Sequence, residues 1–563
     1  MEHFNIKRLI CYSDVFNKDI KTVNRVELVQ SIPTFSAVSW VAYILVQRQF
    51  LRIDQGEIDI LAPLLFKLDK NTCDLVVNYL QRYDHSSIIL FDEYTLVAVI
   101  DFLLDNNNFG YNKDHQLTKM DFGNLFKIIL CFNEEHALNA SHMQELKGLD
   151  EMIRYYLPIQ MKLNNVIFPD DFRVDIIKFC MFVEFCKGNK EFNALLKNFM
   201  IYYRINRWDK YLLNIIDVYT SMGADSQKGP TCVFYFNNPS NIPVINKLIL
   251  DIIHYKSTPD FIMLREKPFL QTGNHELILL IRHFLSEKLY SSFLFDFARI
   301  NGVSYGDVKK KIGLTFTEHF FFYSLVHGSF KNQMDFLYSG AELKPILKNG
   351  EPDYYMRKDN NVFLLECKDI VIDSKTKCSG DVDAIIKSLK ELFVETTEDK
   401  QYHKTLKKSK KKGILQLLRV IAEHLRIILD KIDPFTSDFI NVFPIIVYQD
   451  VSFDVEGVNY ILSNIMRNRM SEFNIDEKYH IQDLAMIPMY ELVQYEDFFS
   501  NNKILIPQIL QDFVLYRNKG GLNAMIPFSK FLGRVAQGAG YHSQRTKRFQ
   551  YILDRLSSLD KFV

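Results

Sequence analysis

The chain has 563 residues, which allows about three or four domains with sizeable cores. Hydrophobic residues make up 48% of the chain and aromatic residues 14%, so the composition excludes a mostly disordered protein. Lys and Arg together number 68, as do Asp and Glu, so no overall positive field marks a nucleic-acid binder and any site for a polyanion must be a local cluster.

Three features of the sequence indicate a protein of the cytoplasm. The eight cysteines are scattered, with no Cys-x-x-Cys pair and no paired histidines at zinc-binding spacing, which is typical of reduced thiols. The first residues lack the basic and then apolar pattern of a signal peptide. The longest apolar stretch, residues 35–46, is too short to span a bilayer and predicts a buried helix. We therefore expect a cytoplasmic location and no contact with a membrane.

Residues 1–255 are predicted to form a helical domain. Segments such as residues 75–104 and 174–203 have apolar residues at spacings of three and four, which is the pattern of packed helices. No motif in this half identifies a role, although it offers room for a protein partner or an oligomer contact. Residues 256–300 are predicted to form a small connector, in which short apolar runs at 261–264 and 275–280 predict a strand pair and residues 284–299 an aromatic-rich helix.

A helix is predicted over residues 313–326. Thr315 would cap its first turn, with Glu318 three residues later as the partner in a capping box. The first strand of a core sheet is then expected at residues 343–347, the second at 353–357 and the third at 362–368.

The second and third of these strands are predicted to form a hairpin that ends in charged residues. Residues that flank a hairpin turn pair across the ladder, so a turn at Asn360-Asn361 would bring Asp353 close to Glu366. The alternation of a strand then places Glu366 and Lys368 on one face and Cys367 on the other. Two carboxylates beside an ammonium group suit a magnesium ion and a phosphate.

A polar loop is expected at residues 373–381, a helix at 382–393 and an amphipathic helix at 414–421. Further core strands are predicted at 441–448 and 483–489, the latter followed by a helix from Tyr490. Residues 501–563 are predicted to form a helical tail. Its Arg534, Arg545, Lys547 and Arg548 would make either a phosphate-facing cluster or a solvated helix face.

Taken together, the pair Pro352-Asp353, the buried strand after it, Glu366 thirteen residues later and Lys368 resemble the PD-(D/E)xK nuclease superfamily. This resemblance covers residues 301–500 and implies a restriction-endonuclease-like core, a mixed sheet flanked by helices. It implies Asp353, Glu366 and Lys368 as catalytic residues. It also implies Mg²⁺ or Mn²⁺ as cofactor, held by Asp353, Glu366, the Cys367 carbonyl and, as an alternative to its capping role, Glu318.

The same resemblance implies that Gln416, on the helix after the core strands, faces the site. Residues 400–426 contain nine Lys or Arg and one Glu, so this segment is either a solvated loop or a set of phosphate contacts. As a nuclease, the chain would use these residues to bind nucleic acid, DNA being favoured: Lys407, Lys408, Lys410, Lys411, Lys412 and Arg419.

The sequence thus predicts an α+β protein with a largely helical first half, a nuclease-like core and a helical tail. The leading hypothesis for its function is a metal-dependent nuclease in prokaryotic defence or DNA processing. One alternative is a catalytically silent module that uses the nuclease fold to bind nucleic acid or a protein, although intact Asp353, Glu366 and Lys368 argue against it. A weaker alternative is a helical adaptor in which the motif is coincidental. No Gly-x-x-x-x-Gly-Lys-Ser/Thr motif indicates an ATPase.

Overall fold

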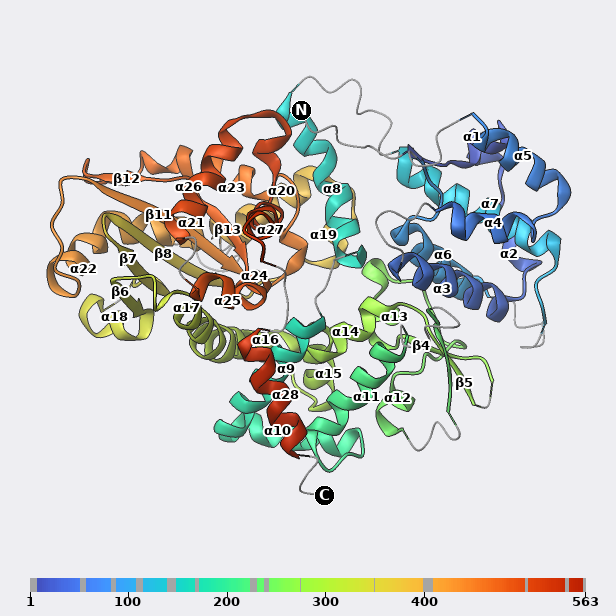
Figure 1. Ribbon diagram of the computed structural model, residues 1–563, viewed down its shortest axis with the longest axis horizontal. Helices are drawn as coiled ribbons and strands as arrows, with labels where there is room; N and C mark the ends of the chain where they lie inside the picture. The colour runs from blue at the N-terminus through green and yellow to red at the C-terminus, as the bar shows by residue number, and fades with distance from the viewer. Residues whose placement is uncertain are drawn as a thin grey trace, which may run out of the picture. The chain divides into compact units, whose positions relative to one another are not determined.

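The chain forms two compact units, and its α+β class is confirmed (Figure 1). Unit 1 comprises Met1–Leu146 and Asn193–Gly302, and unit 2 comprises Lys147–Phe192 and Val303–Val563. The expected boundary near residue 300 falls at this division, whereas residues 147–192, expected with the N-terminal half, belong to unit 2. The computed structural model describes residues 8–50, 57–82, 88–107, 115–138, 148–167, 172–222, 230–236, 242–273, 275–348, 350–397, 409–501, 505–541 and 546–559.

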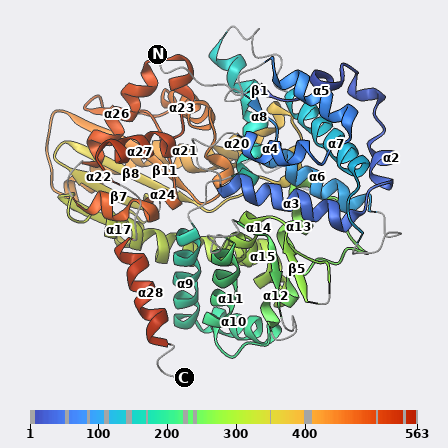
Figure 2. The ribbon, with the colours of Figure 1, turned by 45° about the vertical axis from the view of Figure 1, so that its right-hand side comes forward.

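Unit 1 is mainly helical, as the apolar spacing predicted. The stretch 35–46 lies inside α3 (Thr34–Phe50), where Val38, Val41 and Leu45 are buried. Helix α3 packs on α6 (Glu93–Asp105), which packs in turn on α7 (Lys119–Leu138), and Figure 2 shows these helices side by side. The described residues of this unit before residue 222 also form the α-helices α1 (Tyr12–Phe16), α2 (Arg25–Gln30), α4 (Ile58–Leu65), α5 (Lys70–Leu80), α10 (Lys190–Tyr202) and α11 (Trp208–Ser221).

The second half of unit 1 contains a three-stranded sheet of order β3-β5-β4, formed by Val233–Tyr235, Glu276–Leu279 and Phe269–Gln271. The strand expected at 275–280 is confirmed as β5. The strand expected at 261–264 is wrong, because this segment lies in helix α13 (Ile262–Glu266). Asp260 and Phe261 enter that helix with φ of +63° and +55°.

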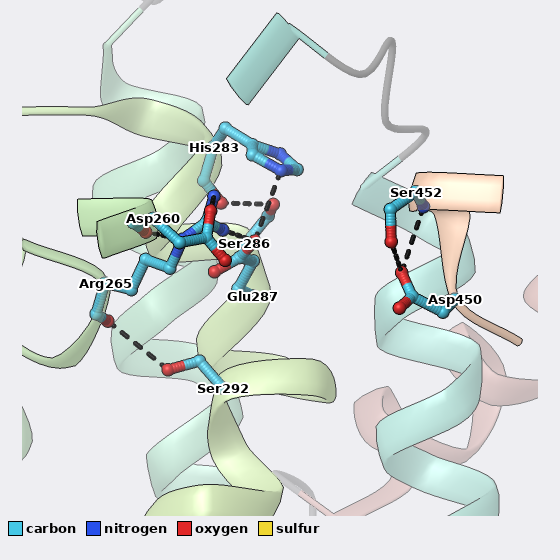
Figure 3. A network of polar contacts seen from close by, with 8 residues as sticks. All are labelled: Asp260, Arg265, His283, Ser286, Glu287, Ser292, Asp450 and Ser452. Atoms are coloured by element: carbon cyan, nitrogen blue, oxygen red, sulfur yellow. Dashed lines mark hydrogen bonds and ion pairs between the residues drawn. The ribbon is translucent and has the colours of Figure 1, made fainter. Parts of the chain in front are cut away.

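Arg265 holds this turn in place. Its Nε donates to the carbonyl oxygen of Asp260 at 2.8 Å, and its guanidinium forms an ion pair with Glu287, as Figure 3 shows. Burial opposes the ionisation of Glu287, but the charge of Arg265 outweighs it and, with the hydrogen bond to His283, lowers the pKa of Glu287 to about 2. The apolar run at 261–264 fits a strand by its local pattern, but that pattern does not include the pairing of Arg265 with Glu287, which lies 22 residues later in the chain.

The aromatic-rich helix expected at 284–299 is divided. Helix α14 (Arg282–Ser286) is followed by a short 3₁₀ turn, and α15 (Ser291–Ile300) begins after Tyr290, whose φ of −143° and ψ of −69° are not helical. The non-helical backbone of Tyr290 therefore separates α15 from α14 and its 3₁₀ turn, although the apolar pattern runs through both segments.

Unit 2 is built on a mixed sheet of order β12-β11-β8-β7-β6, with β13 also paired to β11 (Figure 1). The strands β6 (Phe336–Ser339), β7 (Tyr354–Lys358) and β8 (Asn361–Lys368) form an antiparallel meander. Strand β11 (Ile440–Tyr448) lies parallel to β8, β12 (Tyr479–Ile481) and β13 (Ala485–Pro488). The strands expected at 353–357, 362–368, 441–448 and 483–489 are confirmed.

The first expected core strand, 343–347, is wrong. These residues lie in helix α18 (Gly340–Leu347), and the first strand is the preceding β6. The helix starts with a capping box, in which the backbone amide and the hydroxyl of Ser339 both donate to Glu342 Oε2 at 2.7 Å. This Ser-x-x-Glu signature was present in the sequence and outweighs the strand-like run after it.

One face of the sheet is covered by helices α8 (Leu149–Ile167), α20 (Val382–Phe393), α21 (Gly413–Arg419), α22 (Leu425–Lys431) and α23 (Val458–Met470). Val362 and Leu364 of β8 point into this core, whereas Phe363 stacks on Phe443 with ring centroids 5.0 Å apart. Strand β8 is buried on both faces, and its side chains alternate between the two sides of the sheet. Glu366 and Lys368 therefore emerge on the side of α21, and Cys367 on the opposite side.

The helix expected at 382–393 is confirmed as α20, and the polar loop before it contains the short helix α19 (Ser374–Cys378), capped by Asp373. The tail is helical as expected. Unit 2 also contains α9 (Phe172–Gly188), α24 (Met489–Gln494), α25 (Glu496–Ser500), α26 (Ile506–Asn518), α27 (Phe528–Gly538) and α28 (Lys547–Leu559).

Candidate active site

The hairpin of β7 and β8 brings Asp353 beside the end of β8. Its turn lies at Asp359-Asn360, one residue earlier than expected, and Tyr354 pairs with Leu365 at the open end. Asp353 immediately precedes β7, and its Oδ2 accepts a hydrogen bond from the backbone amide of Cys367 at 2.7 Å. The predicted proximity of Asp353 to the Glu-x-Lys segment is therefore confirmed.

Lys368 connects this strand end to helix α21. Its Nζ donates to Glu366 Oε1 at 2.7 Å and to Gln416 Oε1 at 3.1 Å. The backbone amide of Gly413 donates to the same Gln416 oxygen at 2.8 Å, which fixes the amide side chain in the first turn of the helix. Gln416 therefore faces the site, as the resemblance implied, and it orients the ammonium group of Lys368.

Glu318 enters from a helix on the other side of the sheet. The chain is helical without interruption through α16 (Tyr305–Ile312), the π-helix η7 (Gly313–Phe322) and α17 (Tyr323–Phe330). Thr315 thus lies inside the helix and its hydroxyl donates to the Lys311 carbonyl at 2.7 Å, so the predicted capping box with Glu318 is wrong. Glu318 instead turns toward Glu366, whose charge raises the pKa of Glu318, and toward Asp353, whose side-chain hydrogen bond lowers it.

Burial and mutual repulsion raise the pKa of all three carboxyl groups. Burial, and then the Glu318 charge, raise the pKa of Asp353 to about 7. Burial, and then the Asp353 charge, raise the pKa of Glu366 to about 8. Burial, and then the Glu366 charge, raise the pKa of Glu318 to about 7. The cluster therefore shares protons at neutral pH, because three buried carboxylates cannot all be ionised without a compensating cation.

Lys368 supplies part of that compensation. Burial opposes its charge, but Glu366 and Asp353 raise its pKa, so the side chain is an ammonium ion. One positive charge does not balance three acids. This imbalance is the electrostatic signature of a site that takes up another cation.

The chemistry of these residues fits a divalent metal ion. In the conformation described, no group of three or more His, Cys, Asp or Glu side chains among the described residues is arranged to hold one. Glu366, however, is 2% exposed, and its Oε2 has no hydrogen-bond partner among the residues that the structure describes, although an unsatisfied buried carboxylate oxygen is costly. Carboxylate oxygens are the ligands that Mg²⁺ and Mn²⁺ prefer, and Oε2 is available for one.

Asp369 fastens the Glu318 helix to the end of β8. Its carboxylate forms a buried ion pair with Lys309 of α16 and accepts a hydrogen bond from the hydroxyl of Thr317 at 2.7 Å. Asp369 directly follows Lys368, and Thr317 directly precedes Glu318. This pairing therefore sets the separation between the two elements that carry the acids.

A cavity of about 380 Å³ lies next to the acids. Glu318 and Cys367 line it, together with other residues of the α16–η7 helix and of the segment after β8. The acid cluster is thus reached from an open space rather than enclosed in the core.

The basic segment predicted to bind nucleic acid is described only in part. Lys407 and Lys408 lie outside the described residues, and Lys410 and Lys411 lie in β10 (Ser409–Lys411), which pairs with β9 (Glu395–Thr397). Lys412 Nζ donates to the Glu391 carbonyl oxygen at 3.0 Å.

Arg419 lies on the same helix as Gln416 and forms a half-exposed ion pair with Glu423 at 2.7 Å. In the tail, Arg545 lies outside the described residues. Arg548 forms a largely buried ion pair with Glu496 at 2.6 Å. This pairing gives Arg548 a structural role in place of the predicted phosphate contact.

Asp369, Lys309 and Thr317 were not among the site residues predicted from the sequence. Lys309 and Thr317 are eight residues apart and so share a helix face, and Asp369 adjoins the motif. No local pattern, however, shows that this face meets the end of β8. Only the tertiary packing reveals it.

Searches of protein-family models, curated proteins and solved structures found no match to this chain. Within the part of the chain that the structure describes, no helix is long and apolar enough to cross a membrane. The functional interpretation therefore depends on the geometry and electrostatics of the acid cluster.

Proposed function

We propose that this chain is a metal-dependent nuclease of the PD-(D/E)xK type, which hydrolyses phosphodiester bonds of nucleic acid, with DNA favoured. The observation that carries the proposal is the convergence of three carboxyl groups of raised pKa and one ammonium group at the end of β8. Buried, repelling acids destabilise a fold, so their arrangement favours a functional explanation over a structural one.

Asp353, Glu366 and Glu318, with the Cys367 carbonyl, would hold Mg²⁺ or Mn²⁺. When bound, such an ion neutralises phosphate charge and makes water acidic enough to serve as a nucleophile. Lys368, held by Glu366 and Gln416, offers an ammonium group that orients the attacking water and offsets the charge that develops on the phosphate. The resemblance implies in-line attack that leaves 5′-phosphate and 3′-hydroxyl ends.

The protonation of the cluster couples activity to pH. Binding a divalent ion requires the acids to lose their protons, and their raised pKa values of about 7 to 8 place this loss near neutral pH. Metal affinity and cleavage are therefore expected to rise between pH 6 and pH 8.5.

The test is an assay of the purified chain with supercoiled DNA, linear DNA and RNA, in Mg²⁺ or Mn²⁺ and in excess chelator. Asp353→Asn, Glu366→Gln and Lys368→Met should each reduce cleavage by at least 100-fold, because the three side chains act as one unit. Glu477→Gln, an exposed acid in the same unit, is the matched control. Cleavage that persists in chelator, or in all three variants, would refute the proposal.

A catalytically silent binding module is the second candidate, since three intact carboxyl groups and a lysine can also bind a cation without chemistry. The same experiment separates the two, because a binding module would retain nucleic acid in a mobility-shift assay and cleave none. Under the leading proposal, residues 1–255 would recognise a trigger, a partner or the substrate in the cytoplasm, as in a prokaryotic defence or DNA-processing system.

A further inference from the structure

The cavity beside the acid cluster has two walls. One is a single face of the α16–η7 helix, with Gly306, Lys310 and Gly313 along it, and the other is the segment after β8 that contains Ile370. Glu318 and Cys367 belong both to the cavity and to the candidate active site. The cavity therefore adjoins the candidate active site through Glu318 and Cys367, whereas Asp353, Glu366 and Lys368 do not line it.

The helix wall lacks side chains where they would fill the cavity. Gly306 and Gly313 are seven residues apart, two helical turns, and each costs the helix about 1 kcal/mol relative to alanine. An added Cβ at Gly306 would meet only Ser304 Oγ at 3.7 Å, and one at Gly313 would meet Asp369 Cβ at 3.6 Å. Protein packing thus tolerates a methyl group at both positions, and the space that the glycines leave belongs to the cavity.

Two lysines, Lys309 and Lys310, and two acids, Glu318 and Asp369, line the cavity. Lys310 is exposed, and in the part of the chain that the structure describes its side chain makes no hydrogen bond or ion pair. Burial opposes the charge of Lys309, but Asp369 raises its pKa, and the ion pair with Asp369 balances that charge, so Lys310 is the cation left for a ligand. A free ammonium group at the mouth of a cavity is a binding position for phosphate.

Leu314 and Ile370 add apolar surface to the cavity. Leu314 is 52% exposed although it lies beside the site, and Ile370 faces it from the other wall. A cavity with one cationic side and one apolar side fits a ligand that joins a phosphate to a flat apolar ring. Its volume of about 380 Å³ lies near the lower end of the range of small-molecule pockets, roughly 300 to 1,000 Å³, and suits one nucleotide rather than a base pair.

We propose that this cavity binds one nucleotide of the substrate strand, directly beside the phosphate that is cleaved. Lys310 contacts the backbone phosphate of that nucleotide, and its base or sugar lies against Leu314 and Ile370. The assignment rests on the proposed nuclease function for the identity of the ligand. It adds a subsite that positions the strand, so its loss should weaken binding more than it slows the chemical step.

Gly306→Leu tests the subsite because it fills the cavity with a good helix-forming residue. Lys310→Gln removes the free charge. Lys331→Gln is the control, since Lys331 is another exposed lysine that lies before β6, at the end of the sheet away from the acids. Thermal melting of each variant shows whether the fold is intact, and Gly306→Leu should melt no lower than the wild-type protein.

Two measurements are then made on each protein. The first measurement gives Kd in the presence of Ca²⁺. It uses calorimetric titration for a nucleoside 5′-monophosphate and anisotropy over a salt series for a labelled single-stranded oligonucleotide. Cleavage of the same oligonucleotide in Mg²⁺ gives kcat and KM. Gly306→Leu should raise Kd and KM at least tenfold and change kcat less, and Lys310→Gln should lower the salt slope of the oligonucleotide by about 0.7, the value for one single-strand phosphate.

The outcomes separate this inference from the nuclease proposal. A wild-type protein that cleaves, with Gly306→Leu unchanged in KM and Kd, would overturn the subsite and leave the nuclease function intact. A wild-type protein that binds the monophosphate without cleaving, and loses that binding in Gly306→Leu, would support the subsite and overturn the nuclease function. A wild-type protein that binds neither the monophosphate nor the oligonucleotide would overturn the subsite.

Discussion

Replacing Glu366 with glutamine should make the protein more stable at alkaline pH while it removes activity. Glutamine has the shape of glutamate and keeps an oxygen for the ammonium group of Lys368, but it has no charge to bury. In the wild-type protein the buried Glu366 must ionise when the pH exceeds its pKa of about 8. The variant avoids that step.

The magnitude follows from the raised pKa. The pKa of Glu366 rises from 4.5 in the unfolded chain to about 8 in the fold, so the folded protein holds a proton that the unfolded chain releases over this range. Wild-type stability is therefore lost as the pH rises from 4.5 to 8, by about 1.4 kcal/mol for each pH unit. Relative to the wild-type protein, Glu366→Gln should gain about 4 kcal/mol between pH 5 and pH 9.

Differential scanning calorimetry in chelator at pH 5, 7 and 9 measures this gain. For a cooperative unit with the 307 residues of unit 2 (46 in residues 147–192 and 261 in residues 303–563), 4 kcal/mol corresponds to a rise in Tm of roughly 6 °C. Glu477→Gln, which removes an exposed acid, should alter Tm equally little at each pH. A Tm difference between Glu366→Gln and the wild-type protein that stays constant or shrinks from pH 5 to pH 9 would refute the argument from burial.

Mg²⁺ should raise the Tm of the wild-type protein in proportion to the logarithm of the Mg²⁺ concentration, and the rise should be larger at pH 8 than at pH 6. Thermal shift measurements should show that Glu366→Gln loses most of this rise. Asp369→Asn should lower the free energy of unfolding by about 3 kcal/mol, because it leaves the buried charge of Lys309 unpaired, and it should also slow cleavage. Denaturation in urea measures the first effect and a cleavage assay the second. Unaltered cleavage would contradict the positioning role of Asp369. Gly350→Ala should lower the free energy of unfolding by about 2 kcal/mol, because Gly350 has a φ of +88° and an added Cβ would lie 2.7 Å from His424 Nε2. An unchanged Tm would exclude that clash.

Local patterns were sufficient to predict the hairpin that carries the site. The spacing between Asp353 and Glu366, the apolar run between them and the turn residues all depend on neighbours in the sequence, and the structure confirms that these residues meet. Strand alternation likewise placed Glu366 and Lys368 on one face. Each of these inferences uses interactions that close over a few residues, where propensity and period decide the outcome.

The errors arose where one local signal competed with another or with tertiary contacts. Residues 343–347 form a helix because Ser339 and Glu342 cap it, and the apolar run gave no sign of the choice. Thr315 is not a cap because the helix begins ten residues earlier, at Tyr305. The role of Asp369 depends on a helix that lies more than fifty residues away in the chain, and no single-sequence pattern reports that distance.

The acid cluster combines a rigid support with an unfavourable charge arrangement. Asp353 is tied to the backbone of β8, Lys368 to α21 through Gln416, and the Glu318 helix to the strand end through Asp369. These ties offset only part of the burial and repulsion, because the pKa values of the carboxyl groups stay raised. A structural ion-pair network would balance its charges, as the Lys309 and Asp369 pair does next to the cluster. The excess negative charge held at one strand end, beside a cavity with a free lysine, is the arrangement expected where a cation and a phosphate are still to bind.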